Sequence, residues 1–183
     1  MLSTEYRHLL RDLAYKSIKH GLETGKALEI DIAQYPAELQ AKKATFVTLH
    51  RNGELRGCIG ILKPVRPLAE DVAYNAWAAA FTDSRFIPLS ADELDDLDIH
   101  ISILGTPEEM DFTSEASLVK QIRPGIDGLI LEEGINKGTF LPSVWESLTD
   151  SHTFLSHLKL KAGLPADYWS ENIKVMRYTV EEF

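Results

Sequence analysis

The sequence predicts an α+β fold, with mainly antiparallel sheet flanked by helices. Two stretches have the form of β-hairpins, one around Asn52-Gly53 and one around Gly134 to Gly138. Each is followed by helical sequence and then by a strand, so the order hairpin, helix, strand occurs twice. We therefore expect a single domain over residues 1–183 that contains two subdomains, which can interleave in sequence.

Residues 4–20 predict an amphipathic helix, because apolar side chains recur there at three- and four-residue spacing. Ser3 or Thr4 can cap its start, and Gly21 marks its expected end. The next stretch, residues 22–43, has no clean period. We expect it to be a loop that can hold a short helix.

The clearest hairpin is ATFVTLHRNGELRGCIGIL, residues 44–62. Its Asn-Gly pair is the one that best tolerates the positive φ angles of a type I′ turn. Counting outward from this turn pairs Val47 with Cys58. In that register Cys58 and Arg56 share one face of the hairpin, and His50 points to the other.

The rest of the first unit is a helix, a short helix and a strand. The alanines of residues 68–81 allow close backbone approach, so this helix should lie over the hairpin. Ser90-Ala-Asp-Glu93 has the form of a capping box and starts the short helix. Residues 98–104 alternate as a strand with three isoleucines on one face.

The second unit repeats the order. We expect a hairpin over residues 128–142, a helix over about residues 151–162 and a strand over residues 173–180. Gly163 and Pro165 mark the end of the helix.

Composition excludes several classes of function. The net charge of −9 repels phosphate backbones, and the chain has no block of lysine and arginine, so we expect no nucleic-acid partner. A single cysteine rules out an intramolecular disulfide and any multi-thiolate metal site. No run approaches 18 apolar residues and the N-terminus has no leader pattern, so we expect a cytoplasmic protein with no membrane contact.

No cofactor or metal is predicted. The six histidines form no His-Glu-x-x-His pattern, and His152 and His157 diverge on a helix. The chain also has no phosphate-binding glycine loop with its lysine, no dinucleotide fingerprint and no nucleophile-elbow serine.

Cys58 is the first candidate for chemistry. A thiol acts as a nucleophile only as the thiolate, which a nearby cation stabilises, and Arg56 could supply that cation. Gly57 and Gly60 lack side chains, so a ligand or another backbone can approach closely. The alternative is that Cys58 is a buried structural residue and that the glycines serve packing or a bulge.

The stretch FTDSRF, residues 81–86, is the second candidate. Arg85 has the planar fork that suits carboxylate or phosphate, and beside Arg56 it would make an anion site. The alternative is an ion pair between Asp83 and Arg85 that locks the helix end, with Phe86 in the core.

Four stretches together resemble the AMMECR domain family in order and spacing: ATFVTLHRNGELRGCIGIL, AAAFTDSRFIPLSADELDDLDIHISIL, GLILEEGINKGTFLPSVW and KAGLPADYW. The resemblance runs from about residue 5 to residue 180, and LRGCIG is close to diagnostic. It implies an α+β protein of two subdomains with a cleft between them. The positions that match the family, and that the resemblance places near that cleft, are Leu55, Arg56, Gly57, Cys58, Ile59, Gly60, Asp83, Arg85, Phe86 and Pro88.

The resemblance also implies partners, because prokaryotic members are often encoded beside, or fused to, a Memo-like protein and a radical S-adenosylmethionine protein. The leading hypothesis is an enzyme or enzyme component that binds a small anionic substrate or peptide, with Cys58 as nucleophile or thiol carrier and His100 as general base. Substrate contacts would come from Arg56, Gly57, Gly60, Asp83, Arg85 and Phe86. The alternative is a non-catalytic binding or scaffold module that acts with one of those partners.

Overall fold

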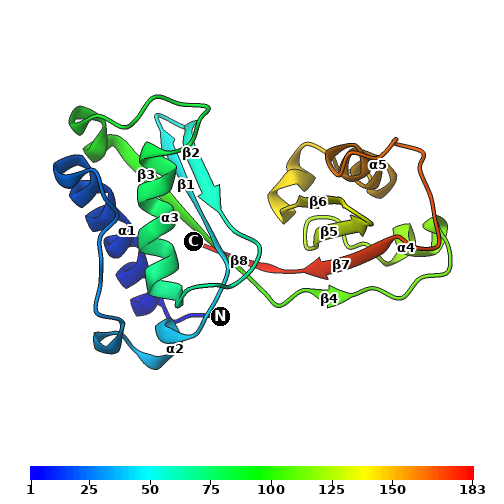
Figure 1. The fold of residues 1–183 in the computed structure, drawn as a ribbon, viewed down its shortest axis with the longest axis horizontal. Helices are drawn as coiled ribbons and strands as arrows, with labels where there is room; N and C mark the ends of the chain where they lie inside the picture. Colours follow the sequence, from blue (N-terminus) through cyan, green and yellow to red (C-terminus); the bar gives the residue numbers. More distant parts are fainter. The chain divides into compact units, whose positions relative to one another are not determined.

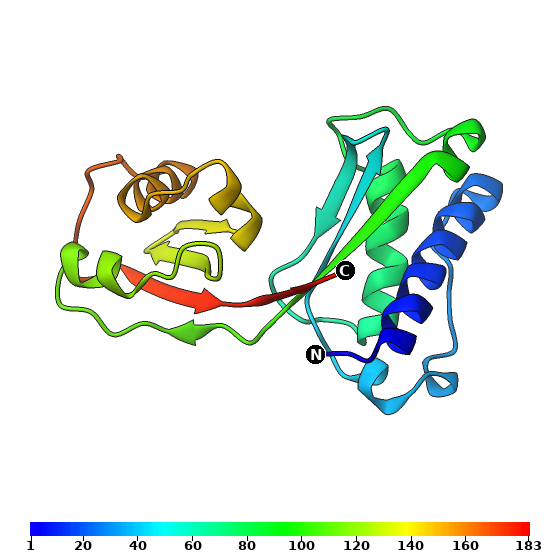
Figure 2. The ribbon, with the colours of Figure 1, turned by 180° about the vertical axis from the view of Figure 1, so that it is seen from behind.

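The computed structural model describes all 183 residues and divides into two compact units. Unit 1 comprises Met1–Leu104 and Glu181–Phe183, and unit 2 comprises Gly105–Val180, so the sequence of unit 2 is inserted into that of unit 1. Each unit contains a four-stranded sheet, with strand orders β2-β1-β3-β8 and β4-β7-β5-β6 (Figures 1 and 2). The predicted α+β class with antiparallel sheets flanked by helices is confirmed.

Nine elements build unit 1: α1 (Thr4–Thr24), η1 (Ile32–Gln34), α2 (Ala37–Gln40), β1 (Thr45–Arg51), β2 (Glu54–Gly60), α3 (Leu68–Phe81), η2 (Ala91–Asp96), β3 (Leu97–Leu104) and β8 (Val180–Glu182). Unit 2 contains β4 (Glu108–Glu109), α4 (Glu115–Gln121), β5 (Gly128–Glu133), β6 (Asn136–Phe140), η3 (Pro142–Glu146), α5 (Ser151–Lys161) and β7 (Lys174–Tyr178). None of the helices combines the length and the apolar character needed to cross a membrane.

The first helix begins as predicted but runs one turn further. Ser3 caps it by accepting a hydrogen bond from the Tyr6 N–H, and the helix ends at Gly25, which adopts the left-handed conformation. The expected end at Gly21 is wrong because this glycine is a packing position. A Cβ there would lie 2.5 Å from Cε2 of Phe81, so the missing side chain lets α1 and α3 approach each other.

The first hairpin has the predicted turn but not the predicted register. Arg51 pairs with Glu54 and His50 with Leu55, but then the register shifts and Leu49 pairs with Gly57. Arg56 is therefore the extra residue of a β-bulge. The predicted pairing of Cys58 with Val47 is wrong.

The bulge reverses the faces beyond it. Cys58 pairs with Thr48, so both side chains lie on the face that also carries His50, and the prediction that His50 points away from Cys58 is wrong. On β3, His100 pairs with Thr48 from the other side.

Helices α1 and α3 lie side by side over one face of the unit 1 sheet, and α3 covers the hairpin as predicted (Figure 1). This face presents buried apolar side chains such as Val47, Leu49 and Ile101 to the helices. Gly57 also faces α3, because a Cβ there would lie 2.1 Å from the Ala79 carbonyl oxygen. We call the opposite face, which carries Thr48, His50, Cys58 and His100, the helix-free face.

Unit 2 has a regular second hairpin, in which Glu133 pairs with Asn136 and Leu131 with Gly138. Its turn is Gly134-Ile135, with Gly134 at a φ of 58°. Helix α5 packs on β6. The hydrophobic core of unit 2 includes the stacked rings of Trp145 and Phe154. The predicted helix and final strand of this unit are confirmed as α5 and β7, whereas β4, α4 and β8 were not predicted.

Candidate functional site

Cys58 lies on the helix-free face, within hydrogen-bond distance of a neighbouring hydroxyl. Its side chain is partly exposed, and Sγ lies 3.2 Å from Oγ1 of Thr48 on β1. The two residues face each other because the bulge at Arg56 shifts the pairing by one residue. The thiol thus has both a polar partner and access to solvent.

Two histidines share this face. His100 follows Thr48 in the same row across the sheet, and His50 lies two residues from Thr48 along β1. Their rings meet edge to face with centroids 5.1 Å apart, and His100 Nε2 lies 2.9 Å from a carboxylate oxygen of Asp98. The face therefore holds a thiol, a hydroxyl, two imidazoles and a carboxylate.

Asp83 and Arg85 attach to the outer edge of β2 at Cys58. Asp83 is buried and accepts the Cys58 N–H at 2.9 Å, while its carboxylate also accepts Nε and Nη2 of Arg85 at 3.0 and 2.7 Å. Nη2 of Arg85 lies 3.4 Å from the Cys58 carbonyl oxygen. Strand β2 is at the edge of its sheet, and this pair satisfies the backbone groups of Cys58 that no strand pairs.

The electrostatics of this pair depend on its short hydrogen bonds. The bonds from Arg85 hold the pKa of Asp83 well below its usual range, against the opposing effect of burial, and the Cys58 N–H lowers that pKa further. The pKa of Arg85 is raised, mainly by the hydrogen bond to Asp83, against the opposing effect of burial, and the negative charge of that carboxylate raises it further. Arg85 therefore stays cationic close to the thiol.

Arg56 has a carboxylate partner within the chain. Its Nε and Nη2 donate to the two oxygens of Glu93 at 2.7 and 3.0 Å, and Nη2 also donates to the Ile87 carbonyl at 3.0 Å. This pairing raises the pKa of Arg56 and lowers that of Glu93 to about 2. The remaining nitrogen, Nη1, is buried and has no hydrogen-bond partner.

The other residues predicted for the site are divided between the two faces. The Phe86 ring is near both guanidinium groups, with its centroid 5.9 Å from Cζ of Arg56 and 5.5 Å from Cζ of Arg85. Gly60 lies beneath the ring of Phe46, which a Cβ would meet at 2.3 Å. Gly57 faces α3 and so lies on the opposite side of the strand from the Cys58 thiol.

The chain is similar to known proteins in sequence and in fold. The family model AMMECR1 matches residues 11–183. The chain belongs to the AMMECR1 family. A protein of Methanothermobacter thermautotrophicus is 37% identical over 184 residues, which cover 100% of this chain and 95% of that protein. Protein MJ0810 of Methanocaldococcus jannaschii is 40% identical over 159 residues, or 85% of this chain and 79% of that protein.

A solved structure has the same fold. The crystal structure of uncharacterized protein PH0010 from Pyrococcus horikoshii superimposes with a TM-score of 0.89 at 38% identity, and the match covers 99% of this chain and 92% of that one. The resemblance to the AMMECR domain inferred from LRGCIG and its companion stretches is confirmed.

Three contacts of this AMMECR1-family site were not predicted. Thr48 as the partner of Cys58, His50 on the same face, and Glu93 as the partner of Arg56 all depend on the bulge or on a contact distant in sequence. The signal for Glu93 was present, because the capping box that it forms with Ser90 fixes its carboxylate beside β2. No group of three or more histidine, cysteine, aspartate or glutamate side chains is arranged to hold a metal ion.

Proposed function

We propose that this AMMECR1-family protein is a thiol-dependent enzyme, or a component of one, that binds a small anionic substrate or peptide beside Cys58. The observation that carries the proposal is the position of the thiol. Cys58 is partly exposed on the helix-free face, 3.2 Å from the Thr48 hydroxyl and on the same face as two histidines. Thiol, base and carboxylate on one face are the side chains that cysteine nucleophiles use.

The proposed roles follow from these positions. Cys58 is the nucleophile or thiol carrier, and Thr48 is a positioning residue that orients the thiol. His100 lies on the other side of Thr48 from Cys58 and is held by Asp98; it is the proposed acceptor of the thiol proton, through the Thr48 hydroxyl, with the ring of His50 beside it. Because diagonal neighbours on a sheet are about 7–8 Å apart, His50 is also within reach of a substrate on Cys58.

The proposed anion site is Arg85. Its side chain is 55% exposed, whereas that of Arg56 is 11% exposed, so Arg85 offers the more accessible guanidinium. Asp83 holds two of its nitrogens and leaves the third, Nη1, without a partner in the chain. A carboxylate on the substrate can bind there beside the thiol.

The test is the alkylation rate of Cys58 as a function of pH, in native and in denatured protein, with neutral iodoacetamide and anionic iodoacetate. Since the ordinary cysteine pKa is about 8.5, an activated thiol should react with a midpoint below that value and faster in the native protein at pH 7. Arg85→Gln should reduce the rate with iodoacetate more than the rate with iodoacetamide.

The matched control is Arg123→Gln. Arg123 binds the buried Asp127 of unit 2 through its N, Nε and Nη2 atoms, the same three atoms through which Arg85 binds Asp83. This substitution should leave both alkylation rates unchanged. A native rate far below the denatured rate, or an equal effect of Arg85→Gln on the two reagents, would contradict the proposal.

A second candidate function is a binding module that acts with a Memo-like or radical S-adenosylmethionine partner. It is favoured by the structural role of the residues around Cys58. Gly57 packs on Ala79, and the side chains of Asp83 and Arg85 bind the Cys58 backbone. In that case Cys58→Ala should fold and retain its partner in a pull-down with purified partner proteins. Loss of the partner in Arg85→Ala alone would favour this candidate over the enzyme.

A further inference from the structure

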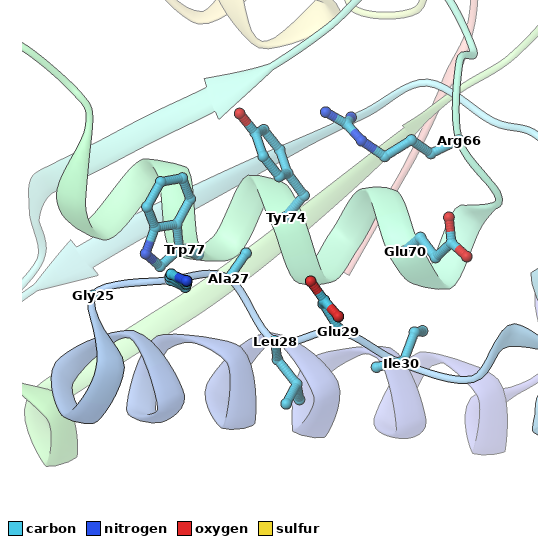
Figure 3. A pocket seen from close by; sticks show the side chains of 10 residues that line it. Gly25, Ala27, Leu28, Glu29, Ile30, Arg66, Glu70, Tyr74 and Trp77 are labelled. Carbon is cyan, nitrogen blue, oxygen red and sulfur yellow. The ribbon is translucent and has the colours of Figure 1, made fainter.

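Unit 1 has a groove that shares no residue with the candidate thiol site. It lies between the segment that follows α1, Gly25–Ile30, and the outer side of α3, and has a volume of about 600 Å³ (Figure 3). No strand contributes to it. This volume falls within the range of small-molecule sites in proteins.

One wall of the groove is aromatic. Tyr74 and Trp77 on α3 both line it, with ring centroids 5.7 Å apart, and Ala27 lines it from the opposite segment. Tyr74 is 40% exposed, so part of its ring is available to a ligand. These side chains suit an apolar group of modest size.

Arg66 gives the groove a fixed cation. Its guanidinium lies over the Tyr74 ring, with Cζ 4.0 Å from the ring centroid, and Nη1 donates to the fully buried Asp71 at 2.8 Å. No other nitrogen of Arg66 has a partner in the chain. The guanidinium is therefore held in place by stacking on the Tyr74 ring and by one hydrogen bond to Asp71. Its other donors are free to bind a carboxylate.

Two carboxylates line the groove without any partner. Glu70 is half-buried and Glu29 is exposed, and neither makes an ion pair or a side-chain hydrogen bond. Figure 3 shows Glu29 rising from its segment toward α3, in the region between Tyr74 and Glu70. A half-buried carboxylate with no partner is stabilised by an incoming cation.

The charges of the lining are balanced. Lys26 and Arg66 are cationic, and Glu29 and Glu70 are anionic, so the lining carries no large net charge. A ligand with a strong net charge would gain attraction from one pair and repulsion from the other. A small ligand that carries one positive and one negative charge is attracted by both pairs.

From these observations we infer that the groove binds a free α-amino acid with an apolar side chain. Its carboxylate binds Arg66, its ammonium group binds Glu70 and Glu29, and its side chain packs on Tyr74 and Trp77. This inference is independent of the thiol chemistry proposed for the helix-free face, and either can fail without the other.

The test is isothermal titration calorimetry of the full chain with L-phenylalanine and L-leucine, and with the analogues N-acetyl-L-phenylalanine and L-phenylalanine amide. The free amino acids should bind, and each analogue, which lacks one of the two charges, should bind at least tenfold more weakly, because a charged hydrogen bond contributes roughly 1.4 kcal/mol or more. Glu70→Gln should weaken L-phenylalanine binding by a similar factor.

Glu23→Gln is the matched control, because Glu23 is an exposed α1 carboxylate outside the groove. It should bind L-phenylalanine as the wild type does. Cys58→Ala should also bind normally, which separates this site from the proposed thiol site. Absence of heat with both amino acids at millimolar concentration, or binding that Glu70→Gln leaves unchanged, would overturn the inference.

Discussion

The two hairpins of this protein are built alike but differ at one residue. In each, a glycine on the second strand pairs with a leucine on the first and faces a helix: Gly57 pairs with Leu49 and meets Ala79, and Gly138 pairs with Leu131 and meets Ala162. Only the first hairpin has an extra residue, Arg56.

That difference determines which side chains lie beside Cys58. In both hairpins the glycine serves close packing of a helix on a strand. In the first hairpin the bulge places Cys58 beside Thr48 on the helix-free face. The comparison teaches that Gly57 is a packing residue, and that the bulge next to it determines which side chains share a face with the thiol.

The largest effect is expected from a test of the bulge itself, in which a disulfide either forms or does not form. Thr48→Cys places a second thiol directly opposite Cys58, so mild oxidation should form a cross-strand disulfide and remove both free thiols. Val47→Cys is the control, because Val47 faces the helices in the bulged register. A thiol titration after oxidation measures both variants, and a disulfide in Val47→Cys instead would show that the hairpin has no bulge.

The next effect concerns the two glycines. Gly57→Ala puts a Cβ 2.1 Å from the Ala79 carbonyl oxygen, whereas the nearest atom to a Cβ at residue 138 is the Ala162 nitrogen, at 2.9 Å. The first substitution should lower the free energy of unfolding by about 3 kcal/mol and the second by about 1 kcal/mol. Urea denaturation followed by circular dichroism measures both values. Equal losses would mean that α3 can shift as easily as α5.

The smallest effect compares an ion pair that joins the first hairpin to η2 with an ion pair inside the second hairpin. Glu93 is mostly buried against Arg56, whereas Glu132 pairs with Lys137 on the surface. Because Glu93 is only 10% exposed, Glu93→Gln should cost about 2 kcal/mol of stability at pH 7. Glu132→Gln should cost less than about 0.5 kcal/mol.

The dependence of the Glu93 effect on pH has a definite sign. The folded pKa of Glu93, about 2, lies below the ordinary value of 4.5, so its ion pair stabilises the fold fully above pH 5. This stabilisation is lost as the pH falls from about 5 to about 2. The stabilities of wild type and Glu93→Gln should therefore converge in acid, and a constant difference over that range would contradict the assignment.

Local signals in the sequence predicted much of the fold. Asn52 and Gly53 have φ values of 53° and 81°, as the Asn-Gly turn requires, and Glu93 accepts the Ser90 N–H as its capping box requires. Both features depend on residues that are close together in the chain.

Features that depend on distant contacts could not be predicted in the same way. Counting residue pairs outward from a turn assumes that the strands pair without interruption. Arg56 interrupts the pairing as the extra residue of a bulge. The contacts made there, from Arg56 to Glu93 and from Gly57 to Ala79, are with residues distant in the chain. The sequence predicts a helix end at Gly21, because nothing near it in the chain shows that Trp77 and Phe81, on another helix, leave no room for a side chain there. For the candidate site, the sequence pointed to Cys58, Asp83 and Arg85 as candidates but gave no signal for the contact between Cys58 and Thr48.

The return of the chain to the first sheet has a consequence for biosynthesis. Strand β8 adds to β3, Glu181 accepts from Arg7 at 3.0 Å, and the Ile101 and Phe183 backbones exchange hydrogen bonds. During translation the unit 1 sheet therefore lacks β8 until the ribosome has synthesised the whole of unit 2. A nascent chain stalled before β8 would expose the unpaired edge of β3, where a chaperone could bind it.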